Sequence, residues 1–252
     1  HIAVGPDAFD SEVAVGAGGG GKHLAVQLEL RVRAETIAPS DPHSVDGADR
    51  RYAGMLSFGL HTQFDWKGNE VSLGADLVVI GPQTGIGSFQ SWAHDVMGMD
   101  PPQGLDDQLP DAMYPTVVIE AGRSLRLNDR TTVRPFFEMR AGVETLVRVG
   151  GDIVLGDLGK VDLMLRDPAT GLRYRGVEGS RSTGVSLMLG GDVAQVFDSA
   201  LLPSGGAAVM SDQRTRLRAG MHWQGEKASA FYGVSYLSPE FDQQVEGQIV
   251  GA

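Results

Sequence analysis

Apolar and polar residues alternate along stretches of this chain that are longer than an ordinary soluble strand. In residues 23–33, leucines and valines take every second position and the positions between them are mostly polar or charged. The same period of two recurs in residues 55–65, 71–80, 116–127, 132–149, 214–224 and 228–237. Because successive side chains of a strand point to opposite faces, each stretch predicts a strand with one apolar and one polar face.

Turn residues separate these stretches at short intervals. Trp66–Asn69 and Asn128–Arg130 each form a turn between two predicted strands. Gly150–Asp152 ends the strand over 132–149, and Gly225–Lys227 joins the strands over 214–224 and 228–237. Such spacing is typical of consecutive antiparallel hairpins. Further strands are expected around residues 2–15, 152–165, 172–178 and 183–197, with one more after Glu246. The total is about twelve, an even number as in bacterial barrels.

Two architectures fit this pattern. In a soluble sandwich the apolar faces meet in a core, whereas in a membrane barrel they face lipid and the charged faces line the lumen. A transmembrane strand needs about 9–11 residues, and the predicted strands meet or exceed that length. We therefore expect an all-β fold, a single antiparallel transmembrane β-barrel over residues 1–252 whose last strand is incomplete.

Aromatic residues near the strand ends fit the interfacial girdles of such a barrel. They are Tyr52, Phe64, Trp66, Trp223, Tyr232 and Tyr236. Scattered surface aromatics are the alternative interpretation. Three histidines, His23, His61 and His222, fall on polar faces and are expected to be solvated in the lumen.

Composition narrows the classes of function. The chain has 21 Lys and Arg against 32 Asp and Glu, a net charge of −11, which argues against a nucleic-acid partner because no basic patch can dominate the field. It has no cysteine, which excludes disulfides and a cysteine nucleophile. The sequence starts at His1 without a basic and apolar leader, and we interpret this as an export signal peptide that has been removed.

One histidine lies outside the alternating stretches. His94 lies within residues 81–115, the longest stretch without the period of two. The same stretch contains five aspartates: Asp95, Asp100, Asp106, Asp107 and Asp111. A neutral histidine can act as a general base when a neighbouring acid orients its ring. The alternative is a loop histidine beside solvated acids.

Several motifs in this region occur together and in a fixed order. They are Gly81-Pro82-Gln83-Thr84-Gly85, FQSWAHDVMG over residues 89–98, PQGLDDQL over residues 102–109, and Asp49-Arg50-Arg51-Tyr52-Ala53-Gly54 with Ala38-Pro39 before it. Together they resemble the signature of the outer-membrane lipid A 3′-O-deacylase family. That family has D-R-P-Y-A-G where this chain has residues 49–54, and T-P where it has Ala38-Pro39. The resemblance implies a twelve-stranded barrel and covers about residues 36–110.

The resemblance also implies roles for individual residues. In the family a histidine activates water on the ester and an acid six residues later assists it, positions that match His94 and Asp100. A calcium ion and an Asn-Asp pair in the first strand complete the family's site. Here that region offers only Asp7 and Asp10, and Lys22–Val26 replaces the family's Y-T-N-G element. Calcium is expected by this resemblance alone.

Two hypotheses of different classes follow. In the first, the protein is an acyl-ester hydrolase of the bacterial outer membrane that acts on lipid A or lipopolysaccharide, with His94 as base, Asp100 orienting it and Asp7 or Asp10 as supporting groups. In the second, motivated by the altered first strand, it is a catalytically degenerate barrel that binds lipid or anchors a membrane protein assembly. A porin-like channel is a weaker third hypothesis, because paired charges would occlude a lumen of this size.

Overall fold

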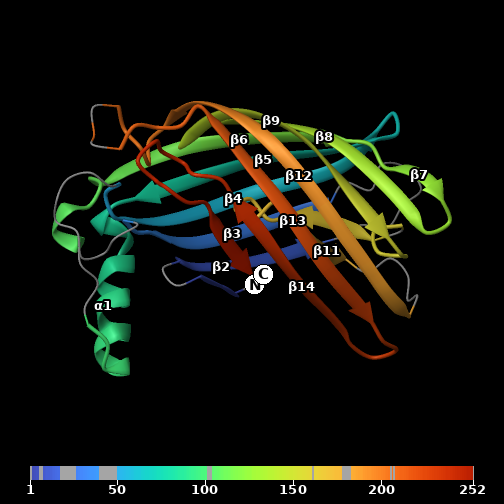
Figure 1. Ribbon diagram of the computed structural model, residues 1–252, viewed down its shortest axis with the longest axis horizontal. Coiled ribbons are helices and arrows are strands. Elements are labelled where there is room, and N and C mark those ends of the chain that lie inside the picture. The colour runs from blue at the N-terminus through green and yellow to red at the C-terminus, as the bar shows by residue number, and fades with distance from the viewer. Residues whose placement is uncertain are drawn as a thin grey trace.

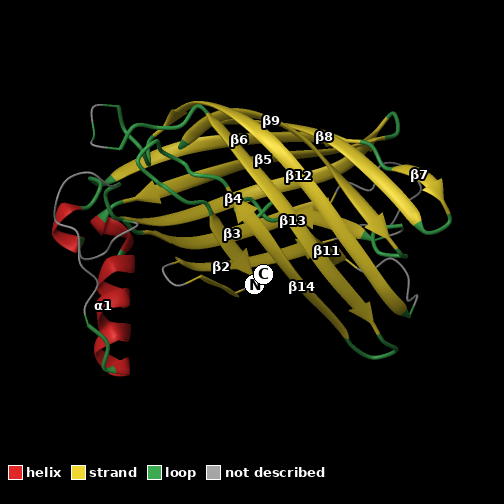
Figure 2. Cartoon of the chain, viewed as in Figure 1, coloured by secondary structure: helices red, strands yellow, loops and turns green. Residues whose placement is uncertain are grey.

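The alternating stretches form long antiparallel strands in the computed structural model (Figures 1 and 2). The structure describes residues 2–5, 8–17, 27–39, 50–100, 104–160, 162–177, 183–204, 206 and 208–251. The strands are β1 (Ile2–Gly5), β2 (Ala8–Ala17), β3 (Gln27–Ile37), β4 (Ala53–Trp66), β5 (Asn69–Ile80), β6 (Ala112–Gly122), β7 (Leu125–Asn128), β8 (Thr131–Ala141), β9 (Glu144–Leu155), β10 (Leu163–Arg166), β11 (Arg173–Val177), β12 (Gly184–Ser199), β13 (Gln213–Gln224), β14 (Ser229–Leu237) and β15 (Gln248–Gly251).

Twelve of the described strands follow one another around one sheet. The order is β1-β2-β3-β4-β5-β6-β8-β9-β12-β13-β14-β15, every neighbouring pair is antiparallel, and β7 extends the sheet beside β8. The first and last strands, β1 and β15, contact each other, and Figure 1 shows the two chain ends side by side. This architecture is the antiparallel barrel of about twelve strands that the alternation predicts.

The sheet is inside out relative to a soluble protein. On β5 the outward residues Leu73 and Leu77 are exposed while Asp76 between them is half-buried. On β8 the phenyl ring of Phe137 is exposed and the carboxylate of Glu138 is buried. Apolar side chains therefore cover the outside and charged side chains occupy the lumen, as expected for strands in lipid. None of the helices within the described residues is long and apolar enough to span a membrane.

The charged side chains of the lumen neutralise one another. Arg216 and Arg148 both bind the carboxylate of Asp192, with N–O distances of 3.0 and 3.1 Å, and Arg148 lies 2.9 Å from Glu138. Other pairs in the same region are Arg134–Glu120, Arg140–Glu138, Arg218–Asp152 and Arg218–Asp192. We call the residues of all these pairs the ionic lumen: Arg134, Arg140, Arg148, Arg216, Arg218, Glu120, Glu138, Asp152 and Asp192. Such pairing is required because an unpaired charge removed from water costs several kcal/mol, roughly.

The histidines of the polar faces take part in this packing. His61 and His222 are buried rather than solvated, and His61 Nε2 lies 3.1 Å from Asp76 Oδ1. The expectation of solvated histidines is wrong for these two because neighbouring lumen side chains fill the space around them. His23 lies outside the described residues.

A hairpin made of β10 and β11 lies inside the barrel and pairs with none of its strands. Arg166 of β10 reaches Glu120 on β6 at 2.7 Å and Asp152 on β9 at 2.8 Å, and its guanidinium lies 3.8 Å from the centre of the Phe136 ring. Arg173 of β11 lies 3.0 Å from Glu70 of β5. We call residues 163–177 the plug, since these contacts hold the hairpin against strands of the wall inside the lumen.

The plug corrects two predicted barrel strands. Residues 152–165 and 172–178 were expected in the wall, but β9 ends at Leu155 and the plug strands have only 4 and 5 residues. Strands this short cannot cross a bilayer, which takes about 9–11 residues. The pattern of polar and apolar residues does not reveal this, because a hairpin packed on the lumen side alternates as a wall strand does.

A second correction concerns residues 132–149, which the sequence predicts as one strand. The structure splits them into β8 and β9 at Gly142, whose φ of 146° favours glycine. The next amide, that of Val143, donates to Thr116 Oγ1 at 3.0 Å. Because the turn has two residues, the alternation continues through it unchanged. Gly150–Asp152 then lie inside β9 rather than at its end.

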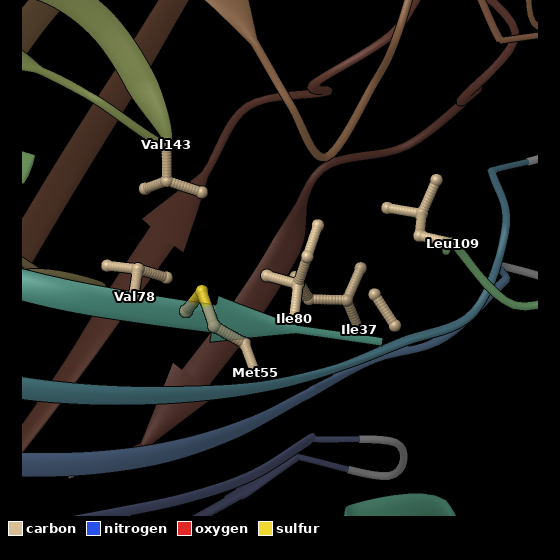
Figure 3. Packing of buried hydrophobic residues seen from close by; sticks show 7 residues of the cluster. Ile37, Met55, Val78, Ile80, Leu109 and Val143 are labelled. Atoms are coloured by element: carbon tan, nitrogen blue, oxygen red, sulfur yellow. The ribbon is translucent and has the colours of Figure 1, made fainter. Parts of the chain in front are cut away.

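An apolar cluster lies at one end of the barrel. Figure 3 shows Ile37, Met55, Val78, Ile80, Leu109 and Val143 pointing toward one another from different elements. With Ala53 they form one buried cluster, which we call the apolar cap. The cap separates the ionic lumen from the loop that follows Ile80.

We predict that the plug contributes strongly to stability through Arg166. The substitution Arg166→Met leaves the carboxylates of Glu120 and Asp152 without this cation, and breaking a buried ion pair costs about 3–5 kcal/mol. Urea unfolding in lipid vesicles measures this free energy. Arg126→Met, at an exposed position of β7, is the matched control. Equal unfolding midpoints for the two variants would contradict the assignment.

Candidate functional site

Residues 81–111 leave the sheet after β5 and build a helical loop at the end of the barrel that carries the apolar cap. The loop contains η1 (Pro82–Thr84), α1 (Ile86–Met97) and η2 (Leu105–Asp107). Gly85 and Gly98 flank α1 with φ of 71° and 68°, left-handed values that end a helix at low cost with glycine. Figure 1 shows α1 at the end of the sheet, with its axis across the long dimension of the barrel.

Tyr52 fixes α1 to the rim of the barrel. Its hydroxyl donates to Gln90 Oε1 at 2.9 Å, and its carbonyl accepts from the amide of Leu109 at 2.9 Å. Gly87 permits the close approach, because a Cβ there would lie 3.0 Å from Leu105 Cδ2 and 3.6 Å from the Tyr52 ring. Tyr52 is only 1% exposed, so its assignment to an interfacial girdle is wrong. Trp66, Trp223, Tyr232 and Tyr236 are exposed as that assignment requires.

Burial also fixes the protonation state of this tyrosine. Removal from water raises the pKa of Tyr52 above its ordinary value of 10.0, against the opposing hydrogen bond with Thr36. The hydroxyl therefore remains protonated through the neutral range and keeps its role as donor to Gln90.

Three further hydrogen bonds hold the start of the loop. The amide of Gln83 donates to Asp111 Oδ1 at 2.7 Å, and the side-chain amide of Gln83 donates to the carbonyls of Ile80 and Ala112 at 2.9 and 3.1 Å. The loop is thus tied to the ends of β5 and β6. Its geometry is set by the barrel wall.

His94 lies in the last turn of α1, where the chain reverses at Gly98. The His94 ring Nδ1 is 2.7 Å from the main-chain carbonyl oxygen of Asp100. A carbonyl only accepts hydrogen bonds, so Nδ1 carries the proton and Nε2 of the neutral ring holds the lone pair. The amide of Met99 donates to the His94 carbonyl at 2.9 Å and keeps the reversal tight. The arrangement presents a nitrogen base of defined tautomer.

The structure brings together two of the four site residues predicted from the sequence. Asp100 meets His94 through its carbonyl, while its side chain is exposed. Asp10 lies on β2 with its backbone opposite Glu35 of β3, near the end of the barrel that carries α1. Asp7 lies outside the described residues.

The described residues do not provide a calcium site. Across the ranges that the structure describes, no group of three or more His, Asp or Glu side chains is placed to hold a metal ion. Asp7, one of the two acids expected to support the site, falls in a gap between those ranges. Calcium therefore stays a prediction of the family resemblance.

A cavity of about 470 Å³ lies in the lumen, on the other side of the apolar cap from α1. Its lining includes Arg31, Arg33, His61, Asp76 and Arg140. His94 is not part of the lining, so the helical loop and the lumen cavity are separate features.

Sequence reasoning missed the residues that position His94. Gln90 precedes His94 by four positions and therefore shares its face of α1, a signal that the sequence does contain. The partner of Gln90 is Tyr52, from a strand start far away in the sequence, and no local pattern connects the two.

Comparisons with known proteins agree with this fold. The family model described as Outer membrane protein LpxR matches residues 11–252. Among solved structures, LpxR from Salmonella typhimurium is similar with a TM-score of 0.78 and 17% sequence identity, over 97% of this chain and 87% of that chain. Among curated proteins, no sequence matches this chain.

We predict that Tyr52→Phe loosens α1 without unfolding the barrel. It removes the hydroxyl group and with it the hydrogen bond with Thr36 and the one to Gln90. Of these two bonds, only the one to Gln90 holds α1, and its loss costs about 1 kcal/mol. Amide hydrogen exchange in residues 86–97 should then become about fivefold faster, while exchange in β12 and β13 stays unchanged. Tyr232→Phe, at an exposed position on β14, is the control. Unchanged exchange in α1 would show that the helix is held by other contacts.

Proposed function

This chain belongs to the Outer membrane protein LpxR family, and we propose that it hydrolyses an acyl ester of lipid A with His94 as the general base. The family match over residues 11–252 and the shared fold make it an outer-membrane, lipid A deacylase-like protein. The proposal adds that the protein is catalytically active. The observation that carries it is the His94 ring, whose Nδ1 is held by the carbonyl of Asp100 so that Nε2 is the basic nitrogen.

The side of the membrane supports this substrate. Bacterial barrels have short periplasmic turns and longer extracellular loops. The turns at residues 67–68 and 129–130 are short, whereas residues 81–111 form a long loop at the opposite end. This difference in length supports a position of His94 on the extracellular side, at the leaflet that contains lipopolysaccharide.

The proposed reaction is a general-base hydrolysis. Nε2 of His94 takes a proton from water, and the water oxygen forms a bond with the ester carbonyl carbon while the carbonyl electron pair moves to its oxygen. The tetrahedral intermediate then collapses and the bond to the sugar oxygen breaks. The protonated His94 returns its proton to that oxygen, so the products are a free fatty acid and a lipid A hydroxyl group.

Asp100 acts in this proposal as a positioning residue through its main chain. Its carbonyl fixes the tautomer and the ring plane of His94. Without this contact the ring could rotate and take either tautomer. Tyr52 and Gln90 fix the helix itself. Asp7 and Asp10 remain the proposed supporting groups, since the register of β2 brings the backbone of Asp10 toward the same end of the barrel.

A catalytically degenerate barrel is the second candidate. The observation that favours it is the first-strand region, where Asp7 and Asp10 stand in place of the family's Asn-Asp pair. In that case the protein would bind lipid or anchor a membrane protein assembly, and the helical loop would be retained for structure.

We predict a sharp difference between two variants at the site. His94→Asn should lower the rate of acyl release from purified lipid A by about 10²–10⁴-fold, the usual contribution of a general base. Asp100→Asn should keep most of the rate, because the contact with His94 uses the carbonyl. Mass spectrometry of the lipid product measures both rates, with calcium present. Asp95→Asn, an exposed neighbour on α1, is the control.

The outcomes separate the candidates. No acyl release by the folded wild-type barrel would favour the degenerate alternative. Full activity of His94→Asn would remove His94 from the mechanism, and loss of activity in Asp100→Asn would show that the carboxylate is needed.

A further inference from the structure

The helix α1 presents its apolar side away from the barrel. Phe89, Trp92 and Val96 are 60%, 60% and 66% exposed, and their spacing of three and four residues places them on one face. The rings of Phe89 and Trp92 pack on each other, with centroids 5.7 Å apart. We call these three residues the apolar stripe.

The opposite face of the helix makes the contacts with the protein. Gly87 is buried, while Gln90 and His94 are half-buried and bind Tyr52 and the Asp100 carbonyl. A helix on a soluble protein does the reverse and turns its apolar face inward. The orientation of α1 therefore matches that of the barrel strands, which also carry their apolar side chains outward.

The stripe continues the lipid-facing surface of the barrel. Only residues 81–85, which include η1, separate α1 from β5, and β5 carries exposed Leu77 near this end. On β6, Met113 pairs with Val79 and is 60% exposed at the same rim. Figure 1 shows the axis of α1 running across the barrel, which is the direction of the membrane plane when the barrel crosses a bilayer.

We propose that α1 is an interfacial helix whose apolar stripe inserts among the acyl chains of the outer leaflet beside the barrel. The helix contains no Lys or Arg, and Asp95 is its only acid. Attachment by apolar burial, rather than by attraction to lipid phosphates, is what this composition allows. Met97 and Met99, both exposed, extend the apolar surface toward the end of the helix.

The insertion has a consequence for the site, which rests on the proposed function. A helix is about 10–12 Å across with its side chains, so His94 on the opposite face lies within that distance of the hydrocarbon. Ester bonds of membrane lipids lie at this boundary. The stripe would thereby select membrane-borne esters over soluble ones.

The test uses a protein whose single tryptophan is Trp92 of the stripe. Trp66→Phe with Trp223→Phe leaves Trp92 as the sole tryptophan of the chain. The protein is reconstituted in phosphatidylcholine vesicles whose acyl chains are brominated, and bromine quenches only indoles that reach the chains. We expect strong quenching of Trp92 by the brominated chains, weak quenching by aqueous acrylamide, and the same result with added anionic lipid.

Two controls keep the result interpretable. Trp92→Phe with Trp223→Phe leaves Trp66, the last residue of β4 at the other end of the barrel, as the reference for an interfacial indole. Phe89→Ser with Val96→Ser in the Trp92-only protein should reduce quenching by bromine and increase quenching by acrylamide. Circular dichroism and heat-dependent gel migration confirm that each variant has folded.

Three results would overturn the proposal. Emission of Trp92 equal in brominated and plain vesicles, with full access for acrylamide, would place the stripe in water. Shielding from both quenchers would mean that a second protein copy covers it. Quenching that depends on anionic lipid would mean attachment by charge. Introducing His94→Asn should leave the quenching unchanged, so loss of catalysis and loss of insertion are distinguishable.

Discussion

The structure depends on charge neutralisation inside a closed sheet. Strands that face hydrocarbon must carry apolar residues outward, so the charged residues in the lipid-embedded part of those strands have to lie in the lumen. There the carboxylates of Asp152 and Asp192 bind arginines from two or more strands, and the plug adds Arg166 to the same network. Paired charges and the plug occupy much of the lumen and leave a cavity of about 470 Å³, an interior that disfavours a porin-like channel. We therefore place the proposed chemistry at the rim.

Contacts at the rim of the barrel position the ring of His94. The apolar cap ends the ionic lumen, and the loop from Gly81 starts directly above it, held by Gln83 at the ends of β5 and β6. Tyr52 then sets the place of α1, and the reversal at Gly98 brings the carbonyl of Asp100 to His94. One side of the helix is thus fixed on the protein and the other faces outward. In the two proposals, the exposed apolar stripe meets the membrane, and His94 on the opposite side of the same helix meets the ester bond.

Much of the fold could be predicted from the sequence because a strand in a barrel wall has a strict period of two. That period gave the outward and inward faces of β4, β5 and β13 correctly, and the glycine and asparagine of the turn at 66–69 marked its hairpin. The period is blind to a two-residue turn, as at Gly142, and to whether a hairpin lies in the wall or inside it, as for the plug. At the site, the motif around His94 pointed to the residue that we propose as the base. The motif did not reveal that Asp100 contacts His94 through its main-chain carbonyl, because the turn at Gly98 determines which atom of Asp100 lies beside the ring.

The most direct measurement of the inverted sheet uses the absence of cysteine from the chain. Single cysteines introduced in turn at residues 72–77 of β5 and carrying a nitroxide label report access to oxygen dissolved in lipid and to a water-soluble nickel complex. The account predicts strong oxygen access at Leu73, Ala75 and Leu77 and weak access to both reagents at Ser72, Gly74 and Asp76. The reverse alternation, or a protein that stays monodisperse in buffer without detergent and shows no oxygen-accessible face, would contradict it.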